Sequence, residues 1–173
     1  MTRYVALLRG INVGGITIKM ADLKDVFTGL GYGDVRTVLA SGNVVFDSEN
    51  TDPASLKADI EAALGVRFGY EAFVFVLEQA RLAGLADACP FEENRDGWHT
   101  YVVFVADPVV REELLGVAVD PQIERTAPGD GVVYWHVVKG STLSSAFGRC
   151  TGRARYKSVT TTRNMRTLRK LQT

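Results

Sequence analysis

The feature that most constrains the fold is an order of short elements that occurs twice along the chain. In the first half, an apolar strand over residues 4–8 is followed by a glycine-rich loop and by a helix with apolar residues at helical spacing. Two β-rich runs then flank residues 41–42, where a glycine suits a tight hairpin turn. A helix that begins at Pro53 and a strand over 70–77 complete the order βαββαβ, which is typical of a ferredoxin-like unit.

The same order returns after a polar loop in the middle of the sequence. A strand is expected over residues 98–106, and an aspartate followed by Pro108 then predicts a helix start. A hairpin with its turn near 128–131 comes next. A short helix, a strand over 156–160 and a terminal helix over 162–171 complete the second half.

This repeated order predicts an α+β fold of two ferredoxin-like (α/β plait) units packed together, each with a trailing helix. The first unit is expected over residues 1–90, and the second over 98–173, ending in a basic helix. A chain of 173 residues is long enough to bury a core without a disulfide or metal. Cys89 and Cys150 are not in a CxxC pattern, and no apolar run approaches the roughly 20 residues of a membrane helix. We therefore expect a cytoplasmic protein with no membrane partner, no metal and no cofactor.

The net charge of zero conceals a strong separation of charge along the chain. Residues 1–21 carry three bases and no acid, whereas residues 22–130 carry all 20 acids and eight bases, a net charge of −12. Residues 131–173 carry nine bases and no acid. Blocks of like charge are either solvated surfaces or interaction surfaces, so the basic C-terminal segment either faces a partner or pairs with the acidic middle of its own chain.

The first candidate ligand site is the glycine-rich loop after the first strand, which contains Arg9, Asn12, Gly14 and Gly15. Backbone amides in such a loop can point at an anion, and the following helix start adds partial positive charge. The loop matches neither the dinucleotide nor the P-loop glycine pattern. The alternative is that its glycines only allow the chain to turn tightly.

The second candidate is the turn that contains Ser41 and Asn43. A serine nucleophile requires a base within hydrogen-bond reach, and the chain has two histidines, His99 and His136, neither of which the sequence brings to Ser41. We expect that Ser41 is not a nucleophile. The alternative to a ligand site is a hairpin whose polar groups satisfy their own backbone.

The third candidate is the terminal helix, with Arg163, Asn164 and Arg166. At about 100° per residue, these arginines share one face with the later bases, whereas the apolar residues lie on the other. An arginine in the first turn of a helix opposes the helix dipole, so Arg163 favours an anionic partner. The alternative is a solvated helix face.

The chain resembles the bacterial family known as domain of unknown function 1697. The resemblance depends on residues 6–15, on 40–46 and on 161–164, with Lys19-Met20 and Leu23 between the first two motifs. The family commonly has tryptophan after the last motif, where this chain has Met165. The resemblance covers nearly the entire chain and implies a pair of α/β plaits, but no activity, substrate or catalytic residue.

Three function classes remain open. The first is a binding protein for a phosphate-bearing or other anionic small molecule, which we favour because the polar motifs lie in loops and near a helix start. Nucleic-acid binding through the basic C-terminal segment is the second. A hydrolase or transferase of unknown substrate is the third, with no catalytic residue identified. The sequence does not decide whether the protein is an enzyme, nor its oligomeric state.

Overall fold

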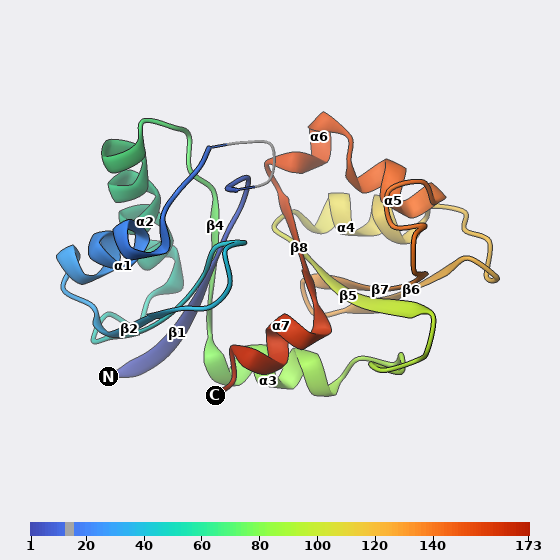
Figure 1. Cartoon of the computed structure of the whole chain (residues 1–173), viewed down its shortest axis with the longest axis horizontal. Helices are drawn as coiled ribbons and strands as arrows, with labels where there is room; N and C mark the ends of the chain where they lie inside the picture. The colour runs from blue at the N-terminus through green and yellow to red at the C-terminus, as the bar shows by residue number, and fades with distance from the viewer. Residues whose placement is uncertain (13–15) are drawn as a thin grey trace. The chain divides into compact units, whose positions relative to one another are not determined.

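The computed structural model describes residues 1–12 and 16–173 (Figure 1). The chain divides into two compact units, which we call the first unit and the second unit. The first unit comprises residues 1–83 together with 170–173, and the second unit comprises residues 84–169. This division falls within one helix, α3, so the helix that trails the first set of strands is shared between the two units.

The first unit is a four-stranded antiparallel sheet with the strand order β2-β3-β1-β4. Its elements in chain order are β1 (Thr2–Leu8), α1 (Met20–Gly29), β2 (Gly33–Thr37), β3 (Asn43–Ser48), α2 (Pro53–Phe68) and β4 (Val74–Glu78), followed by α3 (Gln79–Asp87). This order of strands and helices is that of a ferredoxin-like unit, as predicted.

The first-unit sheet carries its helices on one face, where α1 and α2 lie side by side (Figure 1). The sequence accounts for α2 closely, because Asp52 accepts a hydrogen bond from the Ala54 backbone amide at 3.1 Å and Pro53 occupies the first turn. The helix ends at Gly69, whose φ of 68° is the left-handed conformation that glycine adopts without strain. Leu23 of α1 and Ile60 of α2 are fully buried against the sheet.

The second unit repeats the arrangement, with the strand order β6-β7-β5-β8 and antiparallel pairing throughout. Its elements are β5 (Trp98–Val105), α4 (Pro108–Leu115), β6 (Glu124–Gly129), β7 (Val132–Val138), α5 (Ala146–Thr151), α6 (Ala154–Lys157), β8 (Thr160–Asn164) and α7 (Met165–Lys170). Asp107 caps α4 as Asp52 caps α2, since its carboxylate accepts from the Val109 amide at 2.9 Å. The second plait is therefore confirmed. The position that α2 holds in the first unit is taken here by two short helices, α5 and α6.

The end of the chain differs from the sequence-based expectation. The predicted strand over 156–160 and helix over 162–171 were wrong, because β8 covers Thr160–Asn164 and α7 begins only at Met165. Three consecutive threonines have β-branched side chains that favour a strand, and β8 pairs with β5. The Asn164 side chain then accepts from the Thr167 backbone amide at 3.0 Å, which caps the helix.

Candidate functional site

The side chain of Asn12 connects the described residues of the loop that follows β1. Its amide nitrogen donates to the carbonyls of Ile18 and Ala40 at 3.1 and 2.8 Å, and its oxygen accepts from the Ile18 amide at 2.9 Å. Asn12 itself has φ of 57°, a left-handed conformation that asparagine tolerates better than most residues. The predicted ligand residue Asn12 therefore has three hydrogen bonds to the backbone, which join it to Ile18 and to Ala40 in the β2–β3 connection.

The turn between β2 and β3 is fixed by a second buried asparagine. The amide nitrogen of Asn43, which is fully buried, donates to the Val38 carbonyl and to Ser41 Oγ at 2.8 and 2.9 Å. Gly42 between them has φ of 90°, and a Cβ there would lie 2.8 to 2.9 Å from side-chain atoms of Ile11 and Leu8. The turn therefore packs directly against the end of β1 and the start of the following loop.

Arg9, the first residue after β1, begins the first of these loops and follows Leu8, which is bonded to the second. The Arg9 backbone amide donates to the Phe73 carbonyl at 3.1 Å, and the neighbouring Leu8 amide donates to the Gly42 carbonyl at 2.8 Å. The side chain is half-buried, and this burial lowers the pKa of the Arg9 guanidinium below its ordinary value. The ordinary pKa of an arginine is far above neutral, so the group still carries its charge at neutral pH. Arg9, Asn12, Ser41 and Asn43 are thus brought together in the first unit.

Gly14 and Gly15, the remaining predicted ligand residues of this loop, lie outside the described residues. The candidate site is accordingly built from Arg9 and the loops at 9–12 and 38–43.

The predicted ligand residues of the C-terminal segment belong to the second unit and are placed differently from the expectation. Arg163 is on β8 and is only 7% exposed, so its expected position in the first turn of a helix was wrong. Its guanidinium donates to Thr161 Oγ1 at 2.7 Å and to the Thr162 carbonyl at 3.0 Å. Asn164 caps α7, and Arg166 is exposed on that helix.

Part of the basic C-terminal charge is offset by acids of the second unit. Arg169 pairs with Asp87 at 2.7 Å and with Glu93, and these carboxylates raise the pKa of its guanidinium. Arg155 pairs with Glu113 at 2.8 Å. Together with the burial of Arg163, these pairs leave fewer bases for a nucleic-acid backbone than the sequence count indicates.

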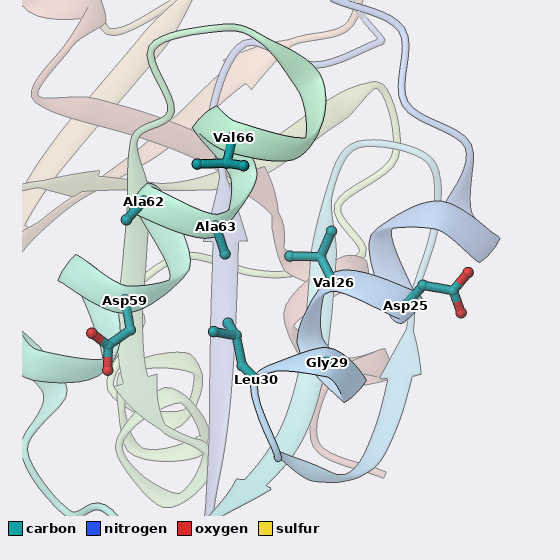
Figure 2. A pocket seen from close by; sticks show the side chains of 8 residues that line it. All are labelled: Asp25, Val26, Gly29, Leu30, Asp59, Ala62, Ala63 and Val66. Carbon is teal, nitrogen blue, oxygen red and sulfur yellow. The ribbon is translucent and has the colours of Figure 1, made fainter.

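A groove of about 470 Å³ lies between α1 and α2 in the first unit (Figure 2). Its lining is mostly apolar, and Figure 2 shows two carboxylates, of Asp25 and Asp59, on opposite sides of the apolar residues. The other lining residues are Val26, Gly29, Leu30, Ala62, Ala63 and Val66. None of the predicted ligand residues lines this groove, and its two acids do not suit an anion.

One buried ionisable residue that the sequence analysis did not single out is Glu124, at the start of β6. The side chain is 1% exposed, and its two oxygens accept from Trp135 Nε1 at 2.9 Å and from the Phe147 amide at 3.1 Å. The carboxylate therefore joins β7 to the first turn of α5, where an acid is favoured. No spacing in the sequence indicates this, because the three residues meet only after the strands pair.

The described residues contain no group of three histidine, cysteine or acidic side chains that could hold a metal ion. Within the same residues, no helix has both the length and the apolar character needed to cross a membrane.

Comparison with solved structures finds a similar protein over almost the full length. A structure described as the conserved bacterial protein SP0830 from Streptococcus pneumoniae has a TM-score of 0.83 and 25% sequence identity, and the match covers 99% of this chain and 97% of that one. No curated protein matches the chain. The motifs at the end of β1 and at the β2–β3 turn lie within the part that a family model matches, residues 1–134. The chain belongs to the family described as "Protein of unknown function (DUF1697)".

Proposed function

We propose that the protein binds a phosphate-bearing or otherwise anionic small molecule at Arg9 in the first unit. The observation that carries the proposal is a half-buried arginine at the end of β1, next in sequence to Leu8, which bonds the β2–β3 turn, and near the hydrogen bonds of Asn12 and Asn43 to the backbone. Arginine presents a planar fork of N–H donors that matches phosphate and carboxylate groups.

Two physical features support this assignment. A partly desolvated cation interacts more strongly with an anion than a fully solvated one does, since the effective dielectric constant near it is lower. A site whose loops are already fixed also loses little conformational entropy when a ligand binds. The hydrogen bonds of Asn12 to Ile18 and Ala40 supply that rigidity.

The compartment we propose is the cytoplasm. Cys89 and Cys150 are both free thiols in the structure, as is usual in a reducing compartment.

The proposal is tested by measuring the binding of inorganic phosphate and pyrophosphate by calorimetry. Arg9→Ala should weaken binding at least tenfold, because a hydrogen bond to a charged group contributes about 1.5 to 3 kcal/mol. The affinity of Arg9→Lys should lie between that of the parent and that of Arg9→Ala, because lysine retains the charge but not the planar fork of donors. The matched control is Lys24→Ala, which removes one exposed charge from α1 and should bind as the parent does. Parent-like binding by Arg9→Ala, or no binding by the parent, would contradict the proposal.

A further inference from the structure

The second unit holds a buried histidine within a stack of flat side chains. His136, on β7, is only 3% exposed. Its ring lies between those of Phe91 and Trp98, whose centroids are 5.2 and 4.8 Å from that of the imidazole. The interplanar angles are 10° and 14°, so the three rings are stacked. The Arg95 guanidinium covers Trp98 at 4.3 Å. The two faces of the imidazole are therefore covered, and only its edge is available for polar contacts.

The hydrogen bonds of Thr100 show which ring nitrogen of His136 carries the proton. Thr100 Oγ1 donates its single hydrogen to the Glu92 carbonyl at 3.0 Å. The Thr100 hydroxyl has no second hydrogen to donate, so in its 2.9 Å contact with His136 the Nδ1–H donates and the hydroxyl oxygen accepts. In the neutral ring, Nε2 consequently carries the lone pair. Nε2 has no hydrogen-bond partner within the part of the chain that the structure describes.

Sheet order places a cation beside that free edge. In the second-unit sheet β7 lies between β5 and β6, so Thr100 is on one side of His136, and Arg125 is its direct cross-strand partner on the other. Direct partners share a face of the sheet, with Cβ atoms about 5 Å apart. The ring nitrogens of imidazole point in nearly opposite directions. The Nδ1 bond to Thr100 thus turns Nε2 toward β6 and Arg125.

The charges around His136 are mostly positive. Burial lowers the pKa of the imidazole, and Arg95 and Arg125 lower it further, whereas Glu92 acts in the opposite direction. Arg95 and Arg125 are both exposed, and neither forms an ion pair with an acid among the described residues. Arg125 therefore lies beside the neutral imidazole on the same face of the second-unit sheet, whereas Arg95 lies farther away, beyond Trp98.

We infer that Arg125 and the protonated edge of His136 form a second, pH-gated binding site for an oxyanion, a sulfate-like, phosphate or carboxylate group of a small molecule. The anion pairs with the Arg125 guanidinium and accepts a hydrogen bond from Nε2–H. One proton is taken up from solvent with each anion bound, because Nε2 in the neutral ring has a lone pair and no hydrogen to donate. Binding therefore strengthens as the pH falls below the ordinary histidine range. This site does not depend on the proposed role of Arg9, which lies in the first unit.

The test is a proton NMR titration of the two histidine rings of the full chain, with and without sodium sulfate and with sodium chloride at equal ionic strength. Sulfate keeps its charge from pH 5 to 8, so any coupling comes from the protein. We expect sulfate to raise the proton affinity of His136 about tenfold, equivalent to one pKa unit. His99 is the internal control and should change much less.

Variants separate a specific site from general screening. Arg125→Ala removes an exposed side chain from an edge strand, so the fold should persist, and the effect of sulfate on His136 should be largely lost. The matched control Arg149→Ala removes an exposed arginine of α5 and should retain the full effect. Equal effects of sulfate on His136 and His99, no effect on His136, or an undiminished effect in Arg125→Ala would each overturn the inference.

Discussion

The two ferredoxin-like units share one strand order, but they fix their interior polar groups with different chemistry. The first unit uses neutral amides, since Asn12 and Asn43 fix the loops at the end of β1. The second unit buries ionisable side chains, among them Glu124 and His136. Amides do not titrate, whereas a buried imidazole ties its contacts to protonation. The comparison therefore indicates a first unit that is insensitive to pH near neutrality and a second unit that responds to it.

The largest expected effect is in the second unit, at Glu124. Glu124→Ala leaves the buried Trp135 indole and the Phe147 amide without an acceptor, and should lower the unfolding free energy by about 3 kcal/mol. Glu124→Gln retains one acceptor and should lose about half as much. Urea unfolding followed by tryptophan fluorescence measures both. A loss under about 1 kcal/mol for the alanine variant would show that the carboxylate does not join β7 to α5.

The corresponding change in the first unit is Asn12→Ala, for which we expect a loss of about 2 kcal/mol, because three backbone hydrogen bonds are removed. Alanine also carries the cost of the left-handed backbone at this position, whereas glycine adopts that conformation freely. The loss measured for Asn12→Gly therefore reports the missing hydrogen bonds without that backbone cost. Unfolding curves at pH 5.5 and 8 should give the same loss. A loss that changes with pH would break the contrast between the units.

A smaller effect is expected from the histidines, both of which belong to the second unit. Burial first, and then neighbouring cations, lower the folded-state pKa of His136 and of His99, where the cations are Lys139 and Arg166. The unfolded chain therefore binds these protons more readily. The corresponding stability is present above the ordinary histidine pKa of about 6.5 and is lost as the pH falls through it toward the lower folded-state values.

The measurement is the unfolding free energy of the parent and of His136→Gln from pH 8 to 5. The parent should lose stability as the pH falls, and the variant should lose less. His99→Gln is the matched control for the more exposed ring. If His136→Gln loses unfolding free energy with falling pH as steeply as the parent does, His136 is not a source of the pH dependence.

The smallest effect is expected at Ser41. Its hydroxyl accepts one hydrogen bond from Asn43, so Ser41→Ala should cost under about 1 kcal/mol. A fluorophosphonate probe should leave Ser41 unlabelled, since both histidines belong to the second unit and no base of that kind is present in the first. Covalent labelling at Ser41 would instead identify an activated nucleophile and replace binding with catalysis as the function of this loop.

The strand order could be predicted because its signals are local. Apolar runs, the aspartate-proline helix starts and the glycine at the β2–β3 turn each act within a few residues. The position of Arg163 was missed, although the β-branched threonines at 160–162 and the spacing of Asn164 to Thr167 were available signals.

The polar contacts across each sheet could not be predicted from spacing. The contacts of Glu124 with Trp135 and Phe147, and the pairing of Arg125 with His136 across two strands, follow only when strand order and register are both known. A shift of one residue in register would move each side chain to the opposite face. The candidate residues around Arg9 were named from the loop sequence, but the structural role of the Asn12 amide required the fold.

The most direct test of the contrast between the units is an amide NMR titration of the full chain with sodium sulfate at pH 8 and at pH 5.5, against sodium chloride at equal ionic strength. The proposed Arg9 site should give perturbed amides in residues 9–12 and 38–43 at both pH values. The amides of Thr100, Arg125 and His136 should respond strongly only at pH 5.5. Perturbations in both regions that do not change with pH, or none in either region, would contradict the account.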